Sequence, residues 1–148
     1  MTTFGLEIEM NNITRRRAAT IAHSYFNSYK ELETGFMDSY LVTDQQGRIW
    51  KFELDASIEG IHSQKTELIT PPLTTDDLPT LKGLLEALKE AEALSSYKRG
   101  CGIHMHISSE GHTPQTLRNL VNIFAAHEEQ LFKMYLFMQP IMQIRVQE

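Results

Sequence analysis

The chain has 148 residues, of which 41% are hydrophobic and 22% charged, a composition typical of one globular domain with a real core. Its net charge of −5 argues against a general nucleic-acid binder, and a single cysteine excludes a disulfide framework or a cysteine-based zinc site. The sequence shows no secretory signal and no apolar run long enough to span a membrane. We therefore expect one cytoplasmic domain over residues 1–148, with no nucleic-acid or membrane partner.

The N-terminal segment predicts a strand followed by a helix. Apolar and polar residues alternate over residues 3–10, which is typical of a strand with one buried face. Thr14 is the expected N-cap of an amphipathic helix over 15–30. The first turn of that helix carries the arginines at 15–17, and positive charge there opposes the helix dipole. These arginines therefore serve either an anionic partner or a solvated helix end.

The rest of the chain continues the mixture of strands and helices. Hydrophobic periodicity and turn residues predict a hairpin over 36–54 around a turn at 44–47, and then a strand over 64–70. A cap at 75–77 predicts the start of a helix, which a strand over 102–109 follows. Thr113 and Pro114 then begin a long helix that runs through Tyr135. This order predicts an α+β fold, a sheet with helices on one face. Polar residues gather on the other face of at least two strands, which leaves that face free for water, a ligand or a second sheet.

Two of the predicted strands carry paired polar residues. His104 and His106 leave the strand on the same side, about 7 Å apart, where they can bind a metal or a phosphate or simply face water. Near the start of the chain, Glu7 and Glu9 alternate with apolar residues, so both carboxylates are also expected on one side of their strand. Two like charges that close cost stability unless something neutralises them, and a divalent cation is the usual remedy.

Other residues extend or compete with this candidate site. Asp55 and Glu67 are two more acids at the ends of strand segments. Carboxylates with one imidazole suit Mg²⁺ or Mn²⁺ better than structural zinc. We expect Cys101 to pack rather than react, and the remaining histidines to lie at the surface: His23, His62, His112 and His127. The sequence contains none of the motifs GxxxxGK[ST], GxGxxG or GxSxG, so it does not support a P-loop, a Rossmann site or a nucleophile elbow.

Five blocks of this sequence resemble, in order, the motif series of the putative amidoligase family, which is grouped with glutamine synthetase and glutamate–cysteine ligase. The blocks are Phe4-Gly5-Leu6-Glu7-Ile8-Glu9, Ile13-Thr14-Arg15, Asp55-Ala56-Ser57-Ile58, Glu67-Leu68-Ile69-Thr70-Pro71-Pro72 and Cys101-Gly102-Ile103-His104-Met105-His106. Each block is weak alone, but the ordered series is specific and spans nearly the whole chain.

The resemblance implies a curved, mainly antiparallel sheet backed by helices, as in glutamine synthetase, with the active site on the concave face. It implies a carboxylate–amine ligase: ATP phosphorylates a carboxylate, an amine attacks the acyl phosphate, and an amide forms. The substrates would be small-molecule or peptide acids and amines, with Mg²⁺ or Mn²⁺ bridging ATP and substrate. By position, Glu7 shares one metal with His104; Glu9, Asp55 and Glu67 hold the neighbouring metal; and His106 faces the nucleotide phosphates as a catalytic and cofactor-binding residue.

Members of that family are longer chains, so the resemblance implies that this chain is the N-terminal half of an amidoligase-like domain. It would be a truncated product, a fragment, or a half-site completed by another copy or a partner. Three alternatives remain open. The chain is a non-catalytic binding or regulatory module, a hydrolase that binds zinc or iron through His104 and His106, or a plain α+β domain with a charged outer sheet face.

Overall fold

The computed structural model describes residues 3–142, which belong to two compact units that meet between Ser108 and Ser109. The first contains β1 (Phe4–Met10), α1 (Arg15–Tyr25), β2 (Glu33–Thr34), β3 (Tyr40–Thr43), β4 (Ile49–Glu53), β5 (Thr66–Ile69), α2 (Leu78–Glu90) and β6 (Ile103–Ile107), and the second contains α3 (Pro114–Met142). The predicted order of strand, helix, hairpin, strand, helix, strand and helix is confirmed.

The strands of the first unit form one sheet in the order β2-β3-β4-β5-β1-β6. Every neighbouring pair in this sheet is antiparallel. The prediction of an α+β fold with an antiparallel sheet is therefore confirmed. The glutamine-synthetase-like shape that the resemblance implies stays a prediction.

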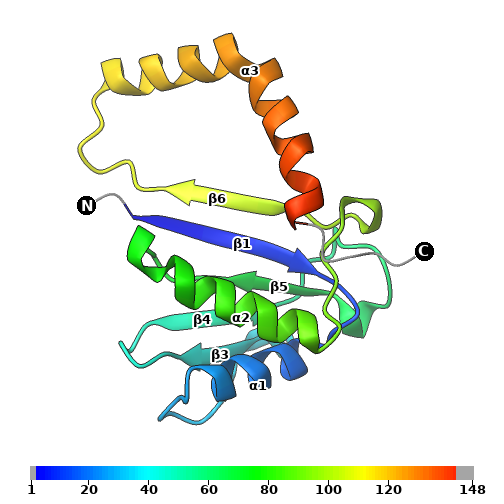
Figure 1. Ribbon diagram of the computed structural model, residues 1–148. Coiled ribbons are helices and arrows are strands. Elements are labelled where there is room, and N and C mark those ends of the chain that lie inside the picture. Colours follow the sequence, from blue (N-terminus) through cyan, green and yellow to red (C-terminus); the bar gives the residue numbers. More distant parts are fainter. Residues whose placement is uncertain (1–2, 143–148) are drawn as a thin grey trace. The chain divides into compact units, whose positions relative to one another are not determined.

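One face of the sheet forms the hydrophobic core with helices α1 and α2, and Figure 1 shows these two helices lying against the sheet. Alternation along β4 sends Trp50 and Phe52 to this face, and both are fully buried. Leu68 on β5 and Ile8 on β1 are cross-strand neighbours in the same layer. Helix α1 packs against β3, β4 and β5, and α2 packs against α1. Both helices cover this face, and the opposite face of the sheet is here called the open face. The charged residues of β1, β4 and β5 and the histidines of β6 lie on the open face.

Helix α1 ends at Tyr25, earlier than the predicted end at residue 30. Phe26 caps it, with its backbone N–H bonded to the carbonyl of Ala22. Asn27 then adopts a left-handed backbone with φ of 48°, a conformation that asparagine tolerates and that stops a helix. Tyr29, which the periodicity placed on the apolar helix face, is consequently 64% exposed.

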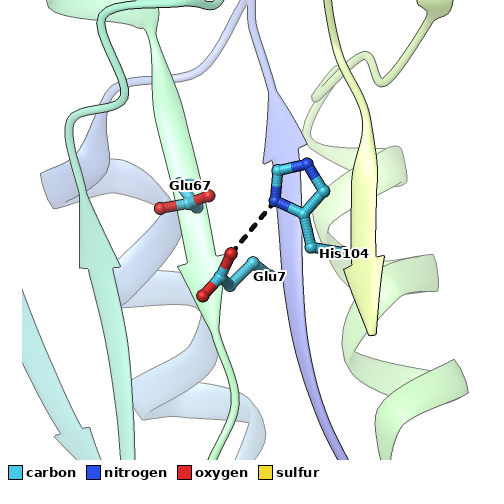
Figure 2. Close-up of side chains that lie close together, drawn as sticks. All are labelled: Glu7, Glu67 and His104. Carbon is cyan, nitrogen blue, oxygen red and sulfur yellow. Dashed lines mark hydrogen bonds and ion pairs between the residues drawn. The ribbon is translucent and has the colours of Figure 1, made fainter. Parts of the chain in front are cut away.

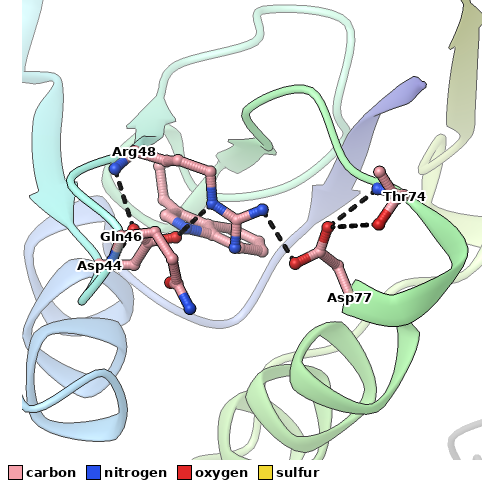
Figure 3. A network of polar contacts seen from close by, with 6 residues as sticks. Asp44, Gln46, Arg48, Thr74 and Asp77 are labelled. Atoms are coloured by element: carbon pink, nitrogen blue, oxygen red, sulfur yellow. Dashed lines mark hydrogen bonds and ion pairs between the residues drawn. The ribbon is translucent and has the colours of Figure 1, made fainter. Parts of the chain in front are cut away.

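A polar network joins the β3–β4 turn to the start of α2 (Figure 3). Asp44, almost fully buried, accepts hydrogen bonds from the backbone and side chain of Arg48 and from the indole of Trp50. Arg48 also donates to Asp77 at 2.9 Å. Thr74 and Asp77 form a capping box ahead of α2, so Asp77 of the predicted cap at 75–77 takes part, with Thr74 as its partner. The network fixes the hairpin turn against the helix.

The short strand β2 and the 3₁₀ turn Phe36–Asp38 that follows it were not separate elements in the sequence prediction. Met37 and Asp38 have left-handed backbones, with φ of 54° and 59°, which is strained for residues other than glycine. The buried Arg15 side chain holds this turn, because it donates to the carbonyl of Asp38 at 3.1 Å and to its carboxylate at 2.6 Å. The same guanidinium donates to the carbonyl of Lys65 just before β5. Arg15 is thus a structural residue, and neither of the roles predicted for it applies.

We expect the substitution Arg15→Met to lower the free energy of unfolding by about 2 kcal/mol, because it leaves backbone carbonyls without their charged donor. Urea denaturation of the variant and the wild type would measure this loss. Arg16→Met is the matched control, since Arg16 is exposed in the same helical turn. Equal losses from the two variants would contradict the structural role of Arg15.

In the second unit, Thr113 caps α3 by accepting the backbone N–H of Thr116 at 3.2 Å. Pro114 occupies the first helical position, as predicted. In the part of the chain that the structure describes, no helix is long and apolar enough to cross a membrane.

Candidate metal centre

Strand register brings the predicted site residues together on the open face. Glu7 on β1 lies directly opposite His104 on β6. Two residues further along β1, Glu9 lies opposite Glu67 on β5. Asp55 follows the end of β4, the next strand in the sheet. Residues far apart in the sequence therefore form one polar surface on four adjacent strands.

Glu7 contacts both histidines of β6. His104 Nδ1 lies 3.1 Å from one carboxylate oxygen of Glu7, and His106 Nε2 lies 2.9 Å from the other. The hydrogen bond from His104 lowers the pKa of Glu7, and the same bond raises the pKa of His104. The two histidine side chains are largely exposed, so both remain accessible to a ligand.

Backbone amides orient two of the other carboxylates. The N–H of Gly102 donates to Glu9 at 2.7 Å, which ties this buried carboxylate to the start of β6. The N–H of Ser57 donates to Asp55 at 2.7 Å and lowers the pKa of that carboxyl group. Both carboxylates are thus fixed in position by a backbone donor.

The carboxylates and His104 form two groups that share one residue. Glu7, Glu67 and His104 make up the first group, and Glu9, Asp55 and Glu67 the second. In each group the potential ligand atoms lie within 4.8 Å of one another, which is close enough to surround a cation. Figure 2 shows the first group projecting from three neighbouring strands on the same side of the sheet. Glu67 belongs to both groups and is therefore the centre of the candidate site.

The position of Glu67 is electrostatically costly without a cation. Burial, together with the neighbouring carboxylates of Asp55, Glu7, Glu53 and Glu9, raises its pKa from the usual 4.5 to about 7. Like charges placed directly opposite on a sheet are destabilising. A divalent cation removes this repulsion, so the donor set fits a metal.

The kind of ligand indicates which metal fits. Hard carboxylate oxygens with one imidazole suit Mg²⁺ or Mn²⁺. Among the described residues, neither group contains both His104 and His106, and His106 contacts only Glu7 within the candidate site. A zinc or iron centre built on the two histidines therefore has no support in this geometry.

The raised pKa of Glu67 predicts a pH dependence of the metal-free protein. The native state holds this proton more tightly than the unfolded state, so stability falls as pH rises from 4.5 to about 7 and then levels off. Glu7 and Asp55 have the opposite effect on stability, because their pKa values are lowered in the native state. The stability that they contribute is lost only as pH falls below the usual pKa values of these carboxyl groups. Urea denaturation in chelator across this range measures the slope. In Glu67→Gln the decline should shrink, and an identical slope in the variant would contradict the assignment.

The sequence prediction missed Glu53, which lies opposite Glu67 on the open face. Glu53 forms an ion pair with Lys51, two residues earlier on β4. The signal was present, since Lys51 and Glu53 alternate with the buried Trp50 and Phe52. Cys101 is buried, and burial raises the pKa of its thiol, which agrees with the predicted packing role.

Comparison with known protein families shows which family this chain belongs to. The family model described as "Putative amidoligase enzyme" matches residues 1–135, a range that includes every predicted site residue. No curated protein and no solved structure matches the chain. Since the family model covers most of the 148 residues, the chain belongs to the putative amidoligase family.

Proposed function

We propose that this chain carries the metal-binding and ATP-binding half of an amide-forming carboxylate–amine ligase. The observation that carries the proposal is the pair of three-residue groups that share Glu67. Membership of the amidoligase family supports the same reaction class. Two neighbouring divalent ions suit phosphoryl transfer, because together they offset charge on the attacking and leaving oxygens.

In the proposed reaction, a carboxylate oxygen of the acid substrate bonds to the γ-phosphorus of ATP as the bond to ADP breaks. The nitrogen of the amine substrate then bonds to the carbonyl carbon of the acyl phosphate, phosphate leaves, and the surplus protons pass to solvent. Mg²⁺ or Mn²⁺, when bound, would supply charge neutralisation at the phosphoryl oxygens.

The residues of the chain have separate proposed roles. Glu7 and His104 would hold the metal nearer β6, while Glu9 and Asp55 would hold the metal nearer β4, with Glu67 between them. His106 would face the nucleotide phosphates. Its exposed imidazole bonds only one oxygen of Glu7, so it can turn toward a phosphate oxygen.

The proposal extends to the rest of the catalytic domain. We infer a glutamine-synthetase-like domain in which this chain is the N-terminal half, with the open face of the sheet toward the substrates. The remaining half would come from a longer form of the chain, from another copy, or from a partner that completes the sheet.

The test is product formation by the protein with ATP, Mg²⁺ and panels of amino acids, glutamyl compounds and peptides, for this chain and for a form extended to family length. We expect ADP and a new amide, in equal amounts, only when both an acid and an amine are present. Glu67→Gln should make neither product, which controls for contaminating ATPases. Metal and nucleotide binding without turnover by the extended form would overturn the ligase proposal in favour of a binding or regulatory module.

A further inference from the structure

A pocket opens beside the candidate metal centre on the same face of the sheet. Its volume is about 320 Å³, within the range of about 300–1,000 Å³ that is usual for small-molecule sites. The turn after β2 forms one wall through Phe36 and Met37. Leu41 on β3, Lys51 and Glu53 on β4, and Leu54 just after β4 line the rest. All of these residues belong to the first unit.

The pocket adjoins the metal centre through strand register. Lys51 and Leu41 are cross-strand partners, which places Lys51 between the apolar wall and β5. Glu53 is the cross-strand partner of Glu67, the residue shared by the two candidate metal groups. A ligand that fills the pocket and contacts Glu53 is therefore one strand away from Glu67.

The pocket is lined by apolar side chains on one side and by an ion pair on the other. Phe36 and Met37 are 87% and 70% exposed, so their adjacent apolar side chains offer an accessible surface to the side chain of a ligand. Leu41 and Leu54 add to the apolar lining. At the side nearest the metal centre, the ammonium of Lys51 and the carboxylate of Glu53 form an ion pair.

The exposed wall is built with strain. Met37 and Asp38 occupy left-handed backbone conformations, and such conformations persist only where the surroundings hold them. Here the buried Arg15 and the hydroxyl of Tyr40 both bond the carboxylate of Asp38. The fold therefore holds two apolar side chains out over the pocket at a cost in backbone energy, which is typical of a ligand-binding wall.

We propose that this pocket binds the amine substrate of the ligase, and that this substrate is an α-amino acid with an apolar side chain. Lys51 would bind its carboxylate, Glu53 its ammonium group, and Phe36, Met37 and Leu41 its side chain. This orientation points the nitrogen toward Glu67, where the activated acid would lie. The identity of the ligand as the amine substrate rests on the proposed function, whereas the binding itself does not.

The test uses L-leucine as the probe and measures its affinity by calorimetry, with and without Mn²⁺. L-leucine should bind at least about tenfold more tightly than glycine, because only leucine buries an apolar side chain. L-leucine should also bind about tenfold more tightly than 4-methylpentanoate, which lacks the ammonium group, and about tenfold more tightly than 3-methylbutylamine, which lacks the carboxylate. Equal affinities for leucine and glycine in the wild type would overturn the proposal.

Two variants locate the site. Lys51→Met should weaken leucine binding about tenfold but leave 3-methylbutylamine binding unchanged, because that ligand has no carboxylate. Ile49→Ala is the matched control, since Ile49 lies on the same strand and face but does not line the pocket. An unchanged affinity of Lys51→Met for leucine would contradict the assignment.

Mn²⁺ binding by the same samples separates this inference from the proposed function. Mn²⁺ binding without leucine selectivity would overturn the pocket assignment and leave the metal centre standing. Leucine selectivity without Mn²⁺ binding would overturn the metal centre and leave the pocket as an amino-acid site.

Discussion

Replacing Glu67 with glutamine is expected to weaken Mn²⁺ binding by about 100-fold at both proposed sites, because loss of a ligand costs at least as much as loss of its supporting partners. Glu67 is the residue that the two three-residue groups have in common, so a single substitution should affect both ions. The effect should appear as loss of both binding steps in a Mn²⁺ titration followed by electron paramagnetic resonance.

The same variant should be no less stable than the wild type when metal is absent. Burial and four neighbouring carboxylates raise the pKa of Glu67 to about 7, so its ionised form is a burden on the metal-free fold at neutral pH. Glutamine keeps the size of the side chain and removes the charge. Lower metal affinity together with unchanged or higher metal-free stability is a combination that simple misfolding cannot produce.

Glu33→Gln is the matched control for this experiment. Glu33 is an exposed residue of the edge strand β2. Its cross-strand partner is Leu41 on β3, and the partner of Leu41 on β4 is Lys51, so Glu33 lies on the open face. It should bind Mn²⁺ as the wild type does. If Glu33→Gln and Glu67→Gln weaken binding equally, the effect is one of net charge, and the proposed ligand set is wrong.

The largest effect on stability is expected from Asp44→Ala, with a loss of about 3–5 kcal/mol in the free energy of unfolding. Asp44 is 1% exposed and accepts hydrogen bonds from Arg48, from the indole of Trp50 and from the backbone of Gln46. Removal of the carboxylate leaves a buried indole N–H without an acceptor and frees Arg48 from one of its two carboxylate partners. Urea denaturation measures the loss, provided that the slope with denaturant is unchanged.

Asp76→Ala serves as the control for Asp44→Ala, because Asp76 is an exposed acid close to the same network. It should change stability by less than about 0.5 kcal/mol.

Burial alone would raise the pKa of Asp44, but hydrogen bonds from Trp50 and Arg48 outweigh it and keep the pKa below its usual 3.8. The stability that Asp44 contributes should therefore be present above that pH and lost as pH falls through the lowered pKa. A loss below about 1 kcal/mol from Asp44→Ala at neutral pH would contradict the network's role.

Local patterns in the sequence were sufficient to predict the strands that carry the site. Alternation placed Glu7 and Glu9 on one side of β1, and the HxH pair on one side of β6, as the structure has them. Alternation within a strand does not set its partner or its register. That Glu7 faces His104, and Glu9 faces Glu67, depends on pairing between segments 58 to 97 residues apart, which local propensity cannot predict.

The elements that the sequence did not predict depend on long-range contacts. The turn Phe36–Asp38 has a backbone that its own residues disfavour, and it is held by Arg15, which lies 23 residues from Asp38. Arg15 itself looked like a surface arginine because its buried contacts are carbonyls of distant loops. The pocket beside the metal centre depends on that turn, so it too lay beyond a reading of local sequence.

The most direct test of the metal centre is anomalous X-ray diffraction from crystals of this protein soaked with Mn²⁺. We expect two anomalous peaks on the open face, one among Glu7, Glu67 and His104 and one among Glu9, Asp55 and Glu67. Absence of both peaks, or a single peak held by His104 and His106 without Glu67, would contradict the proposed metal centre.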